Sequence, residues 1–522
     1  MSVLSIPDVI QPLPLVTAPR KSGKEVSRRK PRILIVTPEL SVSGFLSRNG
    51  KQAPCVKAGG MADVCALLVD SLSEVGADVH VALPHFETLY QPGAAGHSRH
   101  LHLCQDREFS YRRSVYDGCQ YSNLRAALAF QRDVIQSIVP RIKPDLIHCH
   151  DWMTGLVPAA ARKLGIPTLF TLHNLHDERT SLGHIEDRGV DAAKFWEHLY
   201  FHQFPGSYES ARNDNSISML ASGILAADQM NTVSRSFLSE LVGGVHGTSW
   251  SVVDAARGKM EAGRAHGIVN SLPASLCPEH DVHLTCQYDA DNHVTGKREN
   301  KRALQRMLGL EQDDDAPILF WPSRLDPVQK GCHLLAEILY QVISDYWALG
   351  VQVVFIGDGP YRKPFEDIAA FHGLENRIAV RGFCEGLSRM GYAASDFTLM
   401  PSAYEPCGLS QMIGLRYGSL PIVHATGGLR DTVAPLDSVR QCGNGFAFEY
   451  YDAPGLRWAI DQAMRFQIRP DAEREANISR IMAEATQSFS PDSMVDQYLA
   501  IYRELLEAGG RTMRSQQPSS NP

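Results

Sequence analysis

The sequence lacks any apolar run of the ~18 residues that a helix needs to cross a bilayer. Its apolar runs, such as ILFW and VVFI, are short and are bounded by proline, glycine or charge. The first ~30 residues also lack the hydrophobic core of a secretory signal and end in KSGKEVSRRKPR. We therefore expect a soluble protein with a disordered arm over residues 1–30, a short organelle-targeting peptide being the alternative for that arm.

The eleven cysteines include no Cys-x-x-Cys pair, and no secretory signal implies an oxidising compartment. We interpret them as reduced thiols in a cytoplasmic protein. The net charge of −7, from 51 basic and 58 acidic residues, disfavours a general nucleic-acid binder but permits a local basic pocket for an anionic ligand. We predict neither a nucleic-acid nor a membrane partner, and the sequence does not give the oligomeric state.

Two common enzyme signatures are missing. No Gly-x-Gly-x-x-Gly follows the first β-rich run, which weakens a dinucleotide-binding interpretation. No Gly-x-Ser-x-Gly is present, which weakens an α/β-hydrolase interpretation.

The remaining pattern alternates short β-rich runs with helical-period segments, and it does so twice. The first series is RILIVT, DVHVALP, DLIHCH, PTLFTLH and DQMNTVS, and the second is PILFWPSRL, VQVVFIGDG, NRIAVRGF, FTLMPS, LPIVH and GFAFEY. This alternation is typical of parallel sheets with crossover helices. The predicted fold class is α/β, with two doubly wound, Rossmann-like domains and ligands at the carboxyl ends of the strands and between the domains.

The domain boundaries follow from the same pattern. A Gly-, Ser-, His- and Ala-rich segment over residues 243–278 leads to a predicted connection at its end. The stretch MVDQYLAIYRELLEA has the apolar spacing of an amphipathic helix that must bury one face on a domain. The predicted parts are an arm 1–30, a first domain 31–270, a second domain 271–490, a C-terminal helix 491–508 and a disordered tail 509–522.

In residues 401–433, strand and helix patterns alternate with candidate ligand-binding residues at closer spacing than elsewhere in the chain. The stretch reads PSAYEPCGLSQMIGLRYGSLPIVHATGGLRDTV. Glu405 follows an apolar strand and precedes a turn, Cys407, Gly408 and Leu409, that opens a helix. Unpaired N–H groups at a helix N-terminus suit a diphosphate. A second glycine turn follows at Gly427 and Gly428, although a glycine turn that closes an ordinary βαβ unit remains the structural alternative.

The first half carries weaker motifs. In CVKAGGMADV, Gly59 and Gly60 permit close approach to a ligand, Lys57 supplies a positive charge and Asp63 lies in a favourable helix-start position. A solvated lysine beside a tight turn is the alternative, because Lys-x-Gly-Gly is not a Walker sequence.

Polar residues also follow two strands in HCHDWMTGL and FTLHNLHD. Asp151, His173 and Asn174 are expected at the sheet edge that carries Lys57. Structural hydrogen bonding is the alternative for His148, His150 and His176. We predict no metal site at His148, His150 and Asp151, because alternate strand residues point to opposite faces and no second ligand set appears.

The loop WPSRLDPVQKG places Arg324 and Lys330 after the first strand of the second domain. A planar guanidinium and a flexible ammonium beside one strand end suit a diphosphate. They share a domain edge with Glu405, which favours a site over two solvating surface charges.

Taken together, the motifs resemble those of bacterial glycogen synthases and plant starch synthases, retaining glucosyltransferases that add glucose from ADP-glucose to an α-1,4-glucan. KAGGMADV resembles the family's KTGGLADV, and SRLDPVQKG resembles SRLxxQKG. The long stretch YEPCGLSQMIGLRYGSLPIVHATGGLRDTV is similar to FEPCGLxQxxxxRYGxxPxVxxTGGLxDTV, and HDW, HNL and KRENKRALQRMLGL agree too. The resemblance covers most of residues 32–505.

The resemblance implies two facing Rossmann-like domains (the GT-B architecture), a C-terminal helix that returns to the first domain, and roles for individual residues. Asp151 and His173 would lie near the transferred glucose, Arg324 and Lys330 would bind the diphosphate, and Glu405 would hold glucose hydroxyls. The expected donor-binding residues are Lys57, Gly59, Gly60, Asn174, Asn270, Tyr121, Cys407, Gly408, Leu409, Thr426, Gly427 and Gly428. Glu39 is a further match, and Tyr121 resembles a family tyrosine that stacks near the nucleotide.

Four departures stand beside the resemblance. The Glu39–Lys57 spacing is longer than usual, and Arg324 and Lys330 are one residue further apart than in the common motif. The family's NGID turn reads NSLP at Asn270, and the lysine of INFLKAG is replaced by Ala221. The acceptor-side residues 177–218 match poorly.

The predicted reaction is glucose transfer from ADP-glucose to a glycogen or α-1,4-glucan acceptor with retained configuration, without a cofactor or metal. No well-placed carboxylate pair suggests glycosidase-type double displacement. Two alternatives stay open, namely the same fold using UDP-glucose or a non-glucan acceptor, and a catalytically silent glucan-binding homologue.

Overall fold

The computed structural model describes residues 30–47, 55–90 and 98–515. The predicted arm therefore lies outside the described residues except at Lys30, and so does part of the long segment between Glu39 and Lys57. Both sheets described below belong to one unit that begins at Pro31.

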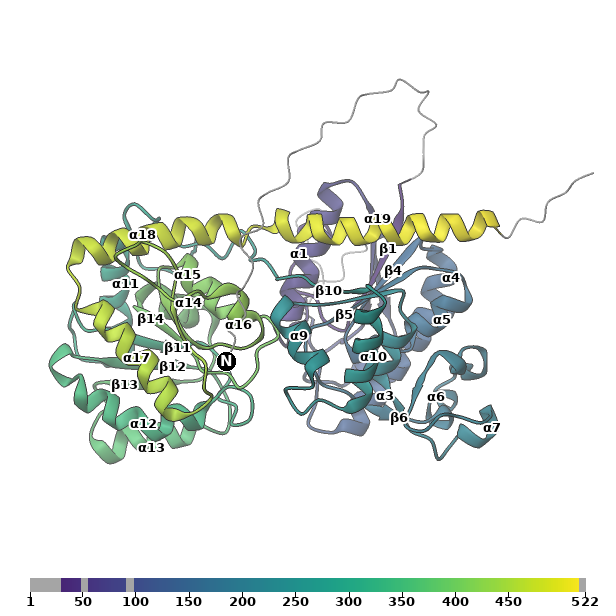
Figure 1. The fold of residues 1–522 in the computed structure, drawn as a ribbon, viewed down its shortest axis with the longest axis horizontal. Helices are drawn as coiled ribbons and strands as arrows, with labels where there is room; N and C mark the ends of the chain where they lie inside the picture. Colours follow the sequence, from purple (N-terminus) through teal and green to yellow (C-terminus); the bar gives the residue numbers. More distant parts are fainter. Residues whose placement is uncertain (1–29, 48–54, 91–97, 516–522) are drawn as a thin grey trace, which may run out of the picture. The chain divides into compact units, whose positions relative to one another are not determined.

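The first sheet is parallel and seven-stranded within these residues, with strand order β10-β9-β5-β4-β1-β2-β3 (Figure 1). All five predicted strands are present. β3 and β10 were not predicted, because LHLC and AHG are short and only partly buried. The strands are β1 (Arg32–Val36), β2 (Asp78–Pro84), β3 (Leu101–Cys104), β4 (Leu146–His150), β5 (Thr168–Leu172), β9 (Gln229–Thr232) and β10 (Ala265–Gly267).

Helices surround this sheet to form what we call the first lobe. A small antiparallel sheet, β6-β8-β7, belongs to the region that matches the family poorly. Its strands are β6 (Arg179–Thr180), β7 (Tyr200–Phe201) and β8 (Ile217–Ser218). The helices of the first lobe are α1 (Gly60–Glu74), α2 (Arg107–Ser110), α3 (Gln120–Asp133), α4 (Val139–Ile142), α5 (Val157–Lys163), α6 (Leu182–Asp187), α7 (Tyr208–Ala211), α8 (Met219–Ala226), α9 (Arg235–Gly243) and α10 (Trp250–Glu261).

The second sheet is parallel and six-stranded, with order β13-β12-β11-β14-β15-β16, and it contains all six predicted strands. We call this sheet and its helices the second lobe. Its strands are β11 (Ile318–Trp321), β12 (Gln352–Ile356), β13 (Ile378–Arg381), β14 (Phe397–Met400), β15 (Leu420–His424) and β16 (Phe446–Phe448). Its helices are α11 (His293–Leu308), α12 (Cys332–Asp345), α13 (Arg362–His372), α14 (Glu385–Ala394), α15 (Ser410–Arg416), α16 (Gly427–Thr432), α17 (Ala453–Gln467) and α18 (Asp471–Ser488).

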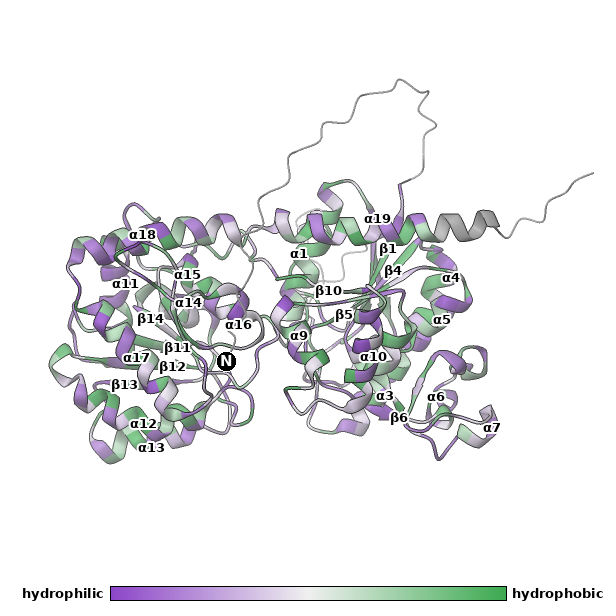
Figure 2. Cartoon of the chain, viewed as in Figure 1, coloured by the Kyte–Doolittle hydropathy of each residue, from purple (hydrophilic) through white to green (hydrophobic). Residues whose placement is uncertain are grey.

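Each sheet lies between two helical layers and is buried on both faces, so its strands read as continuous apolar runs (Figure 2). RILIV, TLFTL and QVVFI have almost no exposed residue. Two doubly wound parallel sheets are the predicted fold class. Within the described ranges, no helix combines the length and apolarity that a bilayer crossing requires.

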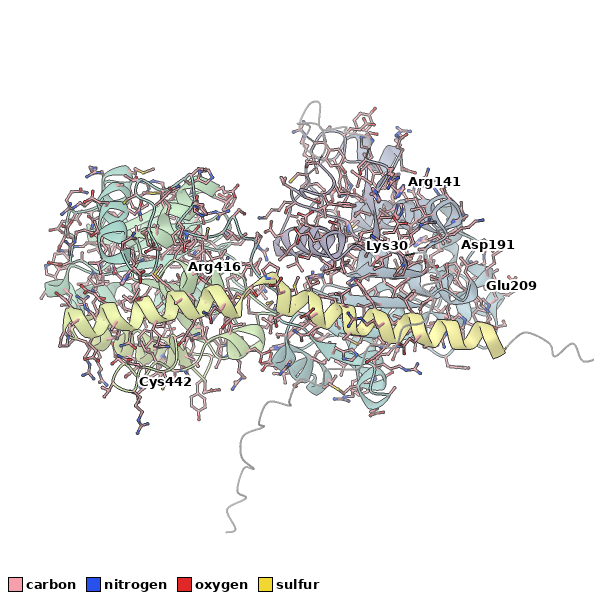
Figure 3. The ribbon with its side chains drawn as sticks, turned by 90° about the horizontal axis from the view of Figure 1, so that it is seen from above. Lys30, Arg141, Asp191, Glu209, Arg416 and Cys442 are labelled. Carbon is pink, nitrogen blue, oxygen red and sulfur yellow. The ribbon has the colours of Figure 1, made fainter. Side chains whose placement is uncertain are left out.

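The last helix, α19 (Pro491–Ser515), packs on the first lobe, as the amphipathic pattern predicted (Figure 3). Its buried side chains join the first core and are Met494, Val495, Tyr498, Ile501, Tyr502 and Leu505. The predicted end at residue 508 is wrong, because the helix runs to Ser515. Apolar periodicity marks where packing against the lobe ends, whereas backbone hydrogen bonding continues beyond it.

A buried chain of hydrogen bonds fastens α19 to the sheet. Tyr502 donates to His148 Nδ1 (2.7 Å), and His148 Nε2 bonds Thr171 Oγ1 (2.6 Å). Thr171 donates to Asn231 Oδ1 (2.6 Å), and Asn231 donates to Tyr498 (3.1 Å). Because Thr171 uses its proton on Asn231, His148 must be the neutral Nε2–H tautomer, and burial lowers the pKa of His148 to about 3.

We expect Tyr502→Phe to lower the free energy of unfolding by about 1–3 kcal/mol, since it leaves His148 Nδ1 buried without its donor. Urea denaturation followed by circular dichroism measures the change. Tyr450→Phe is the control, because Tyr450 is exposed and its loss of a hydroxyl should alter stability by less than about 0.5 kcal/mol. Equal midpoints for the two variants would contradict the role of this network.

Candidate functional site

Glu39 lies just after β1 and organises the loop that contains the KAGG motif. Its Oε2 accepts hydrogen bonds from the backbone N–H groups of Ala58 (2.7 Å) and Gly59 (2.9 Å). Its Oε1 accepts from the hydroxyl of Tyr116 (3.2 Å). Burial raises the pKa of Glu39, and these hydrogen bonds oppose the shift. The Glu39 carboxylate thus fixes the conformation of this loop through hydrogen bonds.

Asp151 occupies the sharp turn after β4. Its backbone has φ 57° and ψ 178°, a region that residues other than glycine rarely adopt, so the surrounding structure must hold it there. Its carboxylate accepts hydrogen bonds from the backbone N–H of His173 (2.7 Å) and from Asn174 Nδ2 (2.8 Å). The structure therefore brings Asp151, His173 and Asn174 together, as the strand-end argument predicted. Burial raises the pKa of Asp151 to about 7, with hydrogen bonds opposing the shift and the charge of Glu39 reinforcing it.

The three histidines of this edge divide into two environments. His150 and His173 share a hydrogen bond of 2.9 Å, whereas His148 belongs to the network below α19. His148 and His150 lie two positions apart on β4 and share a face of the sheet. Their ring centroids are 4.1 Å apart. His176 pairs with Glu178 (2.9 Å), which fits the structural alternative for it.

Lys57 and Gly60 lie at the rim of this group. Lys57 is half exposed and pairs with Asp63 in the first turn of α1 (2.7 Å). A Cβ at Gly60 would lie only 3.0 Å from Leu409 Cδ1 of the second lobe. The KAGG loop (residues 57–60) and the turn of residues 407–409, which we call the CGL turn, therefore meet in the structure, although they are distant in sequence.

On the second lobe, Lys330 and Glu405 form a buried ion pair with 2.5 Å between Nζ and Oε2. Ser402 donates to the same carboxylate oxygen (3.0 Å). Gly331 lets the loop that carries Lys330 approach Pro401. It has φ 72°, and a Cβ there would lie 2.0 Å from the carbonyl oxygen of Pro401. The residue after the lysine must therefore be glycine for Lys330 to reach Glu405.

The turn after Glu405 is held from below by a side-chain amide. Gln411 Nε2 lies within hydrogen-bond distance of the carbonyls of Cys407 (2.9 Å) and Gly408 (3.0 Å). Gly408 has φ 74°, and α15 begins at Ser410 without a side-chain cap. The backbone N–H groups of this turn are therefore presented at the carboxyl end of β14, where the sequence analysis placed them.

The Thr426–Gly428 turn begins α16 and is already paired. Gly427 N–H and Thr426 Oγ1 donate to the carboxylate of Glu240 (2.8 and 3.2 Å), and Gly428 N–H donates to the Glu405 carbonyl (2.9 Å). These groups have protein acceptors in this structure.

Three predicted residues lie in other surroundings. Arg324 is largely exposed and donates to Gln329 (3.3 Å). Asn270 is buried, and its Oδ1 has no hydrogen-bond partner within the described ranges. Tyr121 is exposed on α3, where Arg125 and His184 lie near its ring. Sequence reasoning missed Tyr116, five positions before Tyr121, which donates to Glu39.

Comparison with known proteins covers the same parts of the chain. Residues 32–250 match the family model of the starch synthase catalytic domain, and residues 309–480 match that of glycosyl transferases group 1. A glycogen synthase of Exiguobacterium sibiricum is 33% identical over 495 residues, which cover 86% of this chain and 96% of the relative. One from Geobacillus thermodenitrificans is 31% identical over 500 residues, covering 88% and 97%.

Among solved structures, the catalytic domain of starch synthase IV from Arabidopsis thaliana, bound to ADP and acarbose, is similar with a TM-score of 0.74. It is 24% identical, and the match covers 92% of this chain and 100% of that chain. At this identity the similarity establishes a shared GT-B fold.

We expect the stability of Asp151→Asn relative to the wild type to increase as pH rises from about 4 to 7. The folded-state pKa of Asp151, about 7, exceeds the ordinary pKa of an aspartate, 3.8, so the native state loses stability as pH rises through this window. The variant escapes this loss, and the difference grows toward a ceiling of about 4 kcal/mol above pH 7. Urea denaturation at several pH values measures it.

Asp117→Asn is the matched control with the opposite sign. Burial opposes ionisation of Asp117, but hydrogen bonds from Ser122 and the Cys119 N–H outweigh it and lower its pKa. Its stabilising contribution is therefore present above the ordinary Asp pKa and disappears on acidification. A pH-independent stability difference for Asp151→Asn would refute the assigned burial effect.

Proposed function

Because this chain belongs to the family of glycogen and starch synthases, we propose that it transfers glucose from ADP-glucose to the non-reducing end of an α-1,4-glucan with retained configuration. The observation that carries the proposal is the Lys330–Glu405 pair beside the CGL turn, which meets the KAGG loop at Gly60. Motifs separated by more than 300 residues of sequence thus contribute to one region.

The second lobe provides the donor side of the reaction. Lys330 and Arg324 offset the negative charge that builds on the departing diphosphate, aided by the N–H groups of the CGL turn. Glu405 is held by Lys330 and Ser402, and its remaining acceptor capacity serves the glucose hydroxyls. Such groups are worth about 3 kcal/mol each when they are aimed at developing charge.

The first lobe provides the sugar side. Asp151 fixes the backbone of His173 and the amide of Asn174, which supports a role for the His173 ring beside the transferred glucose. With its pKa lowered to about 3 by burial, His173 is neutral and can donate or accept a hydrogen bond without adding charge. Neutral groups suit a sugar centre that becomes oxocarbenium-like as the glycosidic bond loosens.

No cofactor or metal is part of the proposed reaction, because cationic side chains are available for the diphosphate. A cytoplasmic location is also part of the proposal. It is supported by the eleven cysteines, all of which are described and none of which forms a disulfide.

The acceptor rests on the family membership. Residues 177–218 form the small antiparallel sheet and short helices, with Asp177 accepting hydrogen bonds from Ser218 and from the Leu220 N–H. Ala221, which replaces the family lysine, is fully buried in α8. The replacement of the family lysine by Ala221 therefore changes the packing beneath this region and not an exposed charge.

A donor and acceptor matrix tests the function. Labelled ADP-glucose and UDP-glucose are each supplied with glycogen, maltose and short maltodextrins, and both ADP or UDP release and glucan labelling are measured. We expect glycogen-dependent ADP release and labelled glucan from ADP-glucose. Preferred use of UDP-glucose, or transfer to a non-glucan acceptor, would replace the proposal, and the absence of release would favour a silent glucan-binding homologue.

We expect Lys330→Ala and Glu405→Gln each to lower kcat about 10²- to 10³-fold, because each removes a charge aimed at the reacting groups. Lys363→Ala is the control, since Lys363 is an exposed residue on α13 of the same lobe that pairs with Asp367. ADP release is the readout, and circular dichroism checks folding. Normal turnover in a folded Lys330→Ala variant would remove Lys330 from the mechanism.

A further inference from the structure

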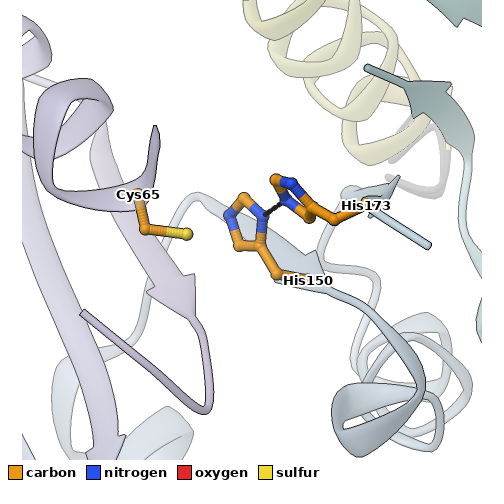
Figure 4. Close-up of side chains that lie close together, drawn as sticks. All are labelled: Cys65, His150 and His173. Atoms are coloured by element: carbon orange, nitrogen blue, oxygen red, sulfur yellow. Dashed lines mark hydrogen bonds between the residues drawn. The ribbon is translucent and has the colours of Figure 1, made fainter. Parts of the chain in front are cut away.

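A thiol and two imidazoles converge behind the reacting region from three separate elements. Cys65 lies on α1, His150 ends β4, and His173 follows β5. One ligand atom from each residue lies within 4.8 Å of the other two (Figure 4). The proposed reaction uses His173 but leaves Cys65 and His150 without a chemical role.

One polar atom of this cluster is unsatisfied. Cys65 and His150 are completely buried. His150 Nε2 has no hydrogen-bond partner within the described ranges, whereas Cys65 Sγ donates to Thr37 Oγ1 (3.5 Å). An unpaired buried nitrogen beside a buried thiol is costly unless a ligand engages it.

Both imidazoles are in the form that binds metals. Burial lowers the pKa of His150 well below its usual range and that of His173 to about 3, so both rings are neutral and keep a lone pair. One thiolate and two imidazoles are ligands of the soft and borderline type that zinc and cadmium favour.

We propose that Cys65, His150 and His173 form a binding site for a soft divalent cation of the zinc and cadmium type, whose occupancy reversibly inhibits glucosyl transfer. In a tetrahedral zinc site, neighbouring ligand atoms are about 3.3–3.7 Å apart. The three candidate ligand atoms lie within 4.8 Å of one another, so small side-chain rotations complete the site.

The bonding change balances with the release of one proton. The Cys65 thiol gives its proton to solvent as the sulfur–metal bond forms. Where the cation takes the nitrogen that carries the proton of the His150–His173 hydrogen bond, that proton moves to the other nitrogen of its own ring. The cation thus replaces a hydrogen bond and a thiol proton, and no redox step is needed.

The surrounding charge favours a cation. Glu39 and Asp151 act electrostatically on Cys65, and both carboxylates are buried. Their described hydrogen bonds come from backbone amides, Asn174 and the Tyr116 hydroxyl, which bring no net positive charge. A divalent ion would be attracted to these carboxyl groups when they are ionised, whereas a thiolate alone would be repelled by them.

We expect inhibition because the cation and the transferred glucose would both need His173. This step rests on the proposed function. A ring bound to the cation can no longer contact the transferred glucose, so donor turnover stops while the fold persists. Because the thiol lies behind the histidines, its replacement leaves the proposed sugar contacts in place.

The test titrates the chelator-treated full-length protein with Cd²⁺ while recording thiolate-to-cadmium charge-transfer absorption in the ultraviolet. Cys65→Val is compared with Cys104→Val, a control thiol that is also buried in the first lobe but lies on β3. We expect the variant at Cys65 to lose one equivalent of cadmium–thiolate absorption that the wild type and the control retain. Cys65→Ser provides a second replacement should the valine variant not fold.

Activity supplies the second readout. Cd²⁺ and Zn²⁺ should inhibit ADP release in the wild type and in Cys104→Val, with recovery on adding EDTA. The midpoint of inhibition should rise at least about tenfold in the Cys65 variants. Unchanged cadmium absorption or an unchanged midpoint in those variants would overturn the site.

The two readouts separate the site from the proposed function. If no glucosyl transfer is observed in any variant, the absorption titration still decides whether the cation binds at Cys65. The separate cluster of Asp78, His80 and His100 does not confuse the absorption titration, because it has no sulfur ligand and Asp78 already pairs with Arg32.

Discussion

The buried hydrogen-bond chain from Tyr502 through His148, Thr171 and Asn231 to Tyr498 is the constraint on which the first lobe depends. It joins the last helix of the chain to β4, β5 and β9, three neighbouring strands of one sheet. Each member is buried and has a partner, so removing one leaves another unsatisfied in a low-dielectric interior. The strands that it fixes lead into His150, Asp151 and His173 at their carboxyl ends.

In the second lobe, the backbone geometry of glycines positions the charged side chains. Gly331 lets the loop after β11 touch Pro401, which brings Lys330 to Glu405. Gly427 and Gly428 let α16 start directly against the carbonyls of Glu405 and Cys407, where a Cβ would lie 2.1–2.2 Å away. The charged pair therefore depends on glycines that carry no charge themselves.

Particular residues show how far sequence reasoning reached. The strand-end rule correctly grouped Asp151, His173 and Asn174, and eleven strands were identified because sheets buried on both faces produce unbroken apolar runs. Short elements escaped: β3, β10 and the helix Trp250–Glu261 have weak periodicity or lie in a Gly-, Ser- and Ala-rich stretch. Tyr116 was missed, because only its hydrogen bond to Glu39 in the structure marks it.

The sequence by itself determined the two wound sheets, the returning helix and the family, because periodicity and long motifs are local properties of the chain. Only the tertiary structure decided which groups touch. Lys330 with Glu405, Gly60 with Leu409, and Cys65 with His150 and His173 are contacts between distant segments. Such contacts depend on loop paths and side-chain rotamers that packing selects, and no spacing along the sequence encodes them.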